Sequence, residues 1–82
     1  MPYIKADRRP ELNQGECPKN AGELNYILTK EIDRYRREHG DSYAVFNDIM
    51  GAIEGAKLEF YRRKVVPYEN IKITENGDVY IK

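Results

Sequence analysis

Apolar residues recur with helical spacing in the first half of the chain. They fall three or four positions apart, as expected on one face of an α-helix. Asn20 followed by Glu23 has the form of an N-terminal capping box, and Gly40 is a typical residue just past a helix end. The pattern therefore predicts a first helix over residues 20–39. Its apolar face consists of Leu24, Ile27, Leu28, Ile32 and Tyr35.

A second helical pattern follows after a short turn at residues 40–42 and runs as far as Pro67. A connection this short favours an antiparallel course for the two helices. Proline disfavours a helical conformation in the residue before it, so we expect the second helix to end there. The prediction is a two-helix hairpin whose second helix spans residues 42–66.

Beyond Pro67 the apolar period changes from helical spacing to alternation. Ile71 and Ile73 precede the turn residues Glu75-Asn76-Gly77, and Val79 and Ile81 follow them. A three-residue loop with Gly77 in the left-handed conformation places all four aliphatic residues on one face. The pattern predicts a β-hairpin over residues 71–82.

Residues 1–19 are polar and contain three of the four prolines. We expect an irregular, extended arm. Tyr3 and Ile4 are its only clearly apolar pair, and whether they add a strand to the hairpin stays open. The predicted fold class is α+β in a single domain of residues 1–82.

The second helix carries apolar residues around more than half of its circumference. A helix facing one neighbour needs an apolar stripe only about 100° wide. Gly51 and Gly55 lie on an arc beside the main apolar face, and each glycine costs about 1 kcal/mol relative to alanine. Close approach of another backbone would offset that cost. The arc, with Leu58 and Val65, is predicted to meet a symmetric copy, or else the hairpin or arm of the same chain.

Composition excludes several classes of protein. The 82 residues contain 14 Lys and Arg and 14 Asp and Glu, so the formal net charge of zero argues against nucleic-acid binding. No apolar run is long enough to span a membrane, and the first residues lack a signal-peptide core. Cys17 is the only cysteine, so no disulfide forms within the chain. We expect a cytoplasmic protein that makes no membrane contact.

Four polar residues form the candidate site for a small ligand. Glu54 and Lys57 interrupt the apolar band of the second helix, and an antiparallel hairpin places Asn25 level with them and Tyr61 one turn away. The cluster either holds a small polar ligand or contains only an ordinary ion pair one helical turn apart. Tyr26 lies on the polar side of the first helix, where it is either an interface residue or an ordinary surface residue.

The sequence offers no catalytic or metal-binding constellation. His39 stands alone at a helix end, and no Ser/His/Asp set, metal-ligand spacing or phosphate-binding glycine loop is present. We therefore expect no enzyme activity, no metal and no cofactor.

Several strings in the chain are similar to those of a known family. They are Met1-Pro2-Tyr3-Ile4-Lys5, Gly22-Glu23-Leu24-Asn25-Tyr26, Gly51 to Arg63, Pro67-Tyr68-Glu69 and Glu75 to Tyr80. The chain resembles a family of small uncharacterised proteins encoded by bacteria, archaea and their phages, a domain of unknown function. The resemblance implies a self-contained small protein of a kind that phages and mobile elements encode, and it supplies no activity.

Two hypotheses about function follow from the sequence. The first is a non-catalytic, homo-oligomeric interaction or accessory protein assembled through the second helix. The alternative is a protein that binds or sequesters a small ligand such as a nucleotide-like anion, and a phage-encoded sequestering protein is one form of this hypothesis.

Overall fold

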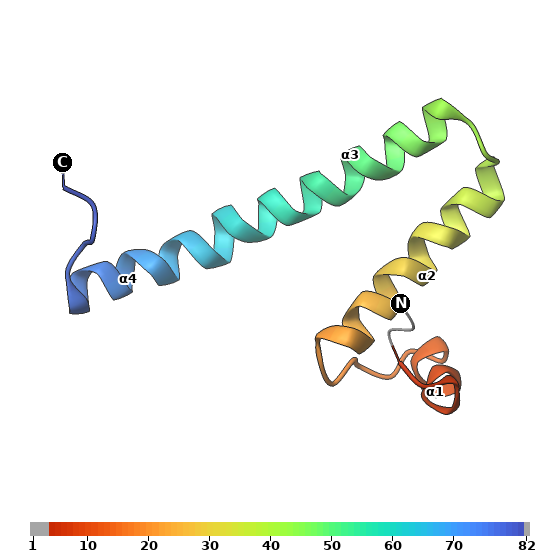
Figure 1. The fold of residues 1–82 in the computed structure, drawn as a ribbon, viewed down its shortest axis with the longest axis horizontal. Helices are drawn as coiled ribbons and strands as arrows, with labels where there is room; N and C mark the ends of the chain where they lie inside the picture. The colour runs from red at the N-terminus through yellow and green to blue at the C-terminus, as the bar shows by residue number, and fades with distance from the viewer. Residues whose placement is uncertain (1–3, 82) are drawn as a thin grey trace. The chain divides into compact units, whose positions relative to one another are not determined.

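The computed structural model describes residues 4–81, and this part of the chain contains helices but no strand (Figure 1). The protein is therefore all-α, and the predicted α+β class is wrong. The chain divides into two units, residues 1–46 and 47–82, each of which is described by itself. The elements are η1 (Ala6–Arg8), α1 (Arg9–Asn13), α2 (Ala21–His39), α3 (Tyr43–Phe60), the π-helical η2 (Tyr61–Val65) and α4 (Val66–Asn76).

Helix α2 begins and ends with the predicted capping residues. The Asn20 side chain accepts a hydrogen bond of 2.9 Å from the backbone N–H of Glu23. At the other end Gly40 has a φ of 91°, and its N–H donates to the Arg36 carbonyl at 2.7 Å. Both caps satisfy backbone groups that a helix end leaves unpaired.

The N-terminal segment is helical where the sequence predicted an irregular arm. Pro10 lies in the first turn of α1, where its missing N–H costs nothing. Leu12 of α1 is 1% exposed and Tyr26 of α2 is 7% exposed, so these two helices enclose a small apolar core. Ile4 lies in a bend rather than a strand, and Tyr3 lies outside the described residues.

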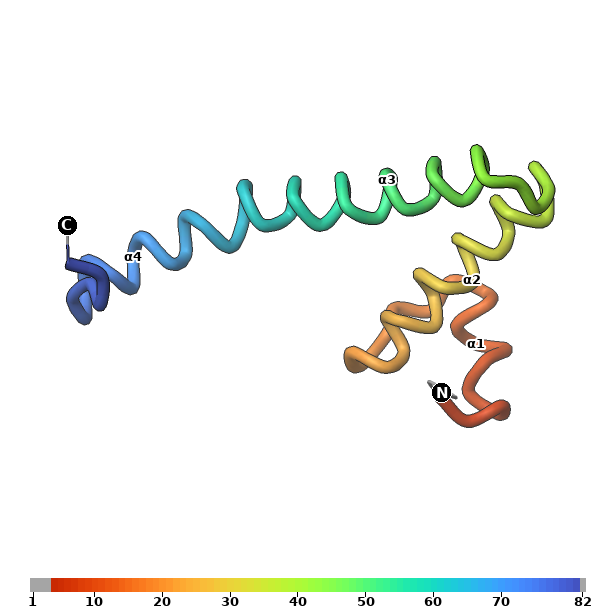
Figure 2. Tube along the Cα trace, turned by 45° about the horizontal axis from the view of Figure 1, so that its top comes forward, coloured from red at the N-terminus to blue at the C-terminus, as the bar shows by residue number. Residues whose placement is uncertain are grey.

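Helices α3, η2 and α4 follow one another without a break (Figure 2). Pro67 does not end the second helix, contrary to the prediction. Proline lacks an N–H and its ring clashes with the carbonyl four residues earlier in a regular helix. Here the preceding turn is π-helical, with the Val66 N–H donating to the Tyr61 carbonyl five residues back. This wider turn accommodates the proline, and the helix continues to Asn76.

The predicted C-terminal β-hairpin is also wrong. Ile71 and Ile73 belong to α4, while Val79 and Ile81 are 90% and 99% exposed. Gly77 has the expected positive φ, 89°, but it ends a helix, and its N–H donates to the Ile73 carbonyl. Extending an existing helix needs no new nucleation, whereas an isolated hairpin is marginally stable.

Candidate interaction surface

The continuous helix from Tyr43 to Asn76 has no buried residue, and neither has the segment after it as far as Ile81. Its large apolar side chains are in contact with solvent: Phe46, Ile53 and Phe60 are 47%, 43% and 62% exposed. Most of the stability of a protein helix comes from packing its apolar face against another element. The exposed face of this helix is therefore the principal candidate for an interaction surface.

The main apolar face forms a narrow line along the helix. In α3 its members alternate three and four residues apart, which is the spacing of a coiled-coil seam. After Phe60 the line continues only if one residue is skipped, and a π-helical turn accommodates one such extra residue. We call this line the seam. It consists of Phe46, Ile49, Ile53, Ala56 and Phe60, then Lys64, Tyr68 and Ile71.

The glycine arc consists of Gly51, Gly55, Leu58 and Val65, and the sequence pattern placed it beside the main apolar face. Once that face is narrowed to the seam, Gly51 and Gly55 lie on the opposite side of α3 from it, because each residue advances about 100°. A Cβ atom built at Gly51 or Gly55 would have no other atom within 4 Å. Leu58 is 53% exposed, and Val65 is partly exposed. No described residue therefore approaches the glycines closely, and the hairpin predicted as one possible neighbour does not form.

The predicted ligand cluster is brought together only in part. The Lys57 ammonium lies 3.4 Å from a carboxylate oxygen of Glu54, and both side chains are exposed. Tyr61 is 49% exposed in the same unit. Asn25 belongs to the other unit, where its Oδ1 accepts a hydrogen bond from the Thr29 hydroxyl. The pair Glu54–Lys57 is observed, and the four-residue cluster stays a prediction.

Tyr26 makes its contacts within the N-terminal unit. Its hydroxyl donates a 2.8 Å hydrogen bond to Oδ1 of Asn13, and the Arg9 guanidinium lies 5.7 Å from its ring centre. Sequence reasoning placed Tyr26 on a polar face without an intrachain core because α1 was not recognised. The sequence signal that could have revealed α1 is Leu12, an isolated apolar residue two positions after Pro10.

An ionic network fastens the N-terminal segment to α2. The Arg8 guanidinium donates to both carboxylate oxygens of Glu23, at 3.0 and 3.1 Å, and lies 2.7 Å from Glu16. The Lys19 backbone N–H also donates to Glu23 at 2.9 Å. The hydrogen bonds from Arg8, and then that from Lys19, hold the pKa of the Glu23 carboxyl below its usual range. Sequence reasoning missed this network.

Acid should weaken the attachment of this segment. A carboxyl whose pKa is lower in the folded than in the unfolded state stabilises the fold above its unfolded pKa, here 4.5, and stops doing so as it becomes protonated. We expect Glu23→Gln to lower the thermal midpoint by a few degrees at pH 7. The difference from wild type should shrink below about pH 4.5. Thermal melts followed by circular dichroism test this, and a difference that is the same at pH 3 and pH 7 would contradict it.

A hollow in the first unit is lined by three cationic side chains, and carboxylates of the same unit neutralise two of them. It measures about 450 Å³, and its lining includes Leu12 and Ile27, the cations Lys30, Arg34 and Arg37, and the carboxylate of Glu31. Arg34 pairs with Glu31, and Arg37 pairs with Asp33. The described residues contain no group of three His, Cys, Asp or Glu side chains that could hold a metal ion.

Comparison with known proteins identifies the family. The model of the domain of unknown function DUF6899 matches residues 1–79, so the chain belongs to that family. This confirms the family resemblance seen in the sequence. No curated protein and no solved structure matches the chain. Among the described residues, no helix has the length and apolar character needed to cross a membrane.

Proposed function

We propose that this is a non-catalytic, cytoplasmic interaction or accessory protein that forms homo-oligomers through the helix Tyr43–Asn76. The observation that supports the proposal is the complete lack of buried residues along this helix. An amphipathic helix of this kind gains its stability by covering its apolar face. A second copy of the chain supplies a surface with the same chemistry.

The lengths of the helices favour a partner outside the chain. The helix Tyr43–Asn76 is about 50 Å long, and α2, with 19 residues, is about 28 Å long. Helix α2 is therefore too short to cover more than about half of it, and α1 has only five residues. The described part of the chain contains no other long helix with which to cover the remainder.

Charge does not oppose self-association. The formal net charge of the chain is zero, so copies repel one another little at long range. Binding of a small anionic ligand stays a prediction, because Glu54 and Lys57 form an ordinary exposed ion pair. Assembly is thus the function that the described surface favours.

The concentration dependence of stability tests this proposal. Binding between folded copies raises the thermal midpoint as concentration rises. We expect the midpoint to increase by several degrees over an approximately hundredfold range of protein concentration. A midpoint that does not change over that range, with a single-chain mass throughout, would contradict homo-oligomer formation.

A further inference from the structure

We propose that the seam pairs with the seam of a second copy in antiparallel orientation, so that α4 of one copy lies along the first half of α3 of the other. This inference rests on the proposed function and specifies its interface. It assigns the contact to the seam rather than to the glycine arc.

The continuity of the seam indicates which partner packs against it. The seam runs from Phe46 to Ile71, across the π-helical turn and past Pro67. A matching partner must itself be a helix of similar length with apolar residues in the same rhythm. Among residues 4–81, which the structure describes, only the helix Tyr43–Asn76 has that length. The partner that fits is therefore a second copy of the same helix.

The charges along the helix determine the orientation. Residues 43–59 carry three carboxylates and one cation, whereas residues 60–76 carry four cations and two carboxylates. Antiparallel pairing places the acidic half of each helix beside the basic half of the other. Parallel pairing would place like charges together, which is unfavourable. The acidic half contains Asp48, Glu54, Lys57 and Glu59, and the basic half contains Arg62, Arg63, Lys64, Glu69, Lys72 and Glu75.

The register follows from matching the members of the two seams. When the helices cross near residue 58, every seam residue faces a seam residue of the other copy. The π-helical turn is part of this match, because its extra residue brings Tyr68 and Ile71 back into line. The resulting layers are Phe46 with Ile71, Ile49 with Tyr68, Ile53 with Lys64, and Ala56 with Phe60.

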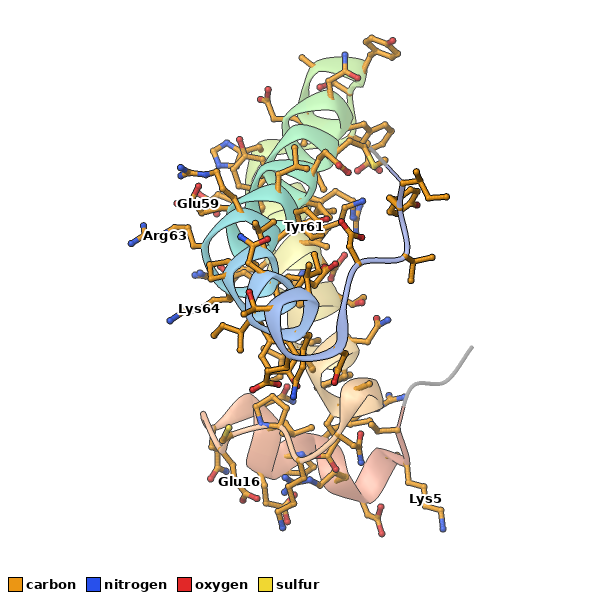
Figure 3. The ribbon with its side chains drawn as sticks, turned by 90° about the vertical axis from the view of Figure 1, so that its left-hand side faces the viewer. Lys5, Glu16, Glu59, Tyr61, Arg63 and Lys64 are labelled. Atoms are coloured by element: carbon orange, nitrogen blue, oxygen red, sulfur yellow. The ribbon has the colours of Figure 1, made fainter. Side chains whose placement is uncertain are left out.

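Lys64 is the one charged member of the seam. The antiparallel register gives both its aliphatic stem and its ammonium group a partner on the second copy. Figure 3 shows its side chain extending away from the helix axis, and no ion pair with another described residue involves it. Opposite Ile53, its aliphatic stem covers apolar surface while its ammonium group reaches the neighbouring Glu54 of the second copy. Long cationic side chains commonly combine these two contacts.

Crosslinking with cysteine pairs tests orientation and face together. In a Cys17→Ser background, Phe46→Cys and Ile71→Cys are introduced together and singly, and each protein is treated with a short bismaleimide. The double variant should give a covalent dimer as the main product. Each single variant should give none, because identical positions near the helix ends lie about 35 Å apart in the antiparallel pair. The matched control is the double variant Ala44→Cys with Ile73→Cys. These two positions also lie at equal heights along the antiparallel pair, but on the helix face that points away from the second copy, so this variant should not crosslink.

The outcomes separate this inference from the proposed function. Efficient crosslinking of either single variant would show parallel pairing and overturn the inference. Crosslinking of the outward control in place of the 46/71 pair would also overturn it. An assembled protein that does not crosslink at 46/71 contradicts the seam while leaving homo-oligomer formation intact. A wild-type protein that stays a single chain contradicts both.

Discussion

Leu12→Ala should destabilise the N-terminal unit by about 3 kcal/mol, which is typical of truncating a fully buried leucine. Leu12 is 1% exposed and is the more deeply buried of the two core residues, the other being Tyr26 at 7%. Removing its side chain leaves a cavity beside Tyr26 that so small a unit has little means to fill. Because a domain of this size loses about 4–8 °C per kcal/mol, the thermal midpoint should fall by more than about 10 °C.

A leucine-to-alanine change on the exposed face of α2 provides the matched control. Leu28 is 56% exposed, so Leu28→Ala should cost less than about 1 kcal/mol. Chemical denaturation of both variants, followed by circular dichroism, gives the two free energies of unfolding. Equal losses for the two variants would show that α1 is not packed on α2 as described.

Ile49→Glu should separate the copies. Ile49 is partly exposed in the single chain, and in the antiparallel pair it faces Tyr68 of the second copy. The change places a carboxylate in each of the two symmetric Ile49–Tyr68 layers, neither of which contains a cation, and burying unpaired charge costs several kcal/mol. A cost of about 3 kcal/mol weakens a dimer by roughly 100-fold. Glutamate is at least as good a helix former as isoleucine, so the helix itself is not weakened.

Gly55→Leu is the control that distinguishes the two faces of α3. A side chain at Gly55 enters open space and increases helix propensity by almost 1 kcal/mol. If copies meet along the seam, this variant keeps its oligomeric mass and becomes more stable. If copies meet on the glycine arc, as the sequence predicts, the variant dissociates. Light scattering of Ile49→Glu and Gly55→Leu together therefore assigns the face of α3 on which copies meet.

Local signals predicted the first helix well because its ends are encoded by local chemistry. The Asn20 cap depends on Glu23 three residues later, and Gly40 supplies the positive φ that follows α2. Both are contacts between near neighbours in sequence. They would be the same in almost any tertiary arrangement.

The helix at the C-terminus could not be predicted from the same kind of signal. Ile71, Ile73, Val79 and Ile81 fit a strand by period, and Pro67 is a typical helix terminator. The structure instead places one π-helical turn before Pro67, and this turn lets α3 continue into α4. A single change in backbone hydrogen bonding thus allows the residues from Pro67 to Asn76 to form a helix.

The N-terminal core was missed because it depends on contacts distant in sequence. Tyr26 is buried by α1, whose hydrogen-bonding residue Asn13 lies 13 positions earlier. The Arg8–Glu23 pair spans 15 positions. Short polar helices of this kind carry almost no periodic signal, since α1 has five residues and a single buried one. The exposed apolar band of the second helix, in contrast, was evident from residue spacing alone.

The mass of the wild-type protein in solution tests the central claim most directly. One chain has a mass of 9.6 kDa. The account predicts that light scattering coupled to gel filtration, at tens of micromolar, gives at least twice that value and that Ile49→Glu returns it to the single-chain value. A wild-type mass of one chain at that concentration, with the helix Tyr43–Asn76 still formed, would contradict the claim that a second copy covers it.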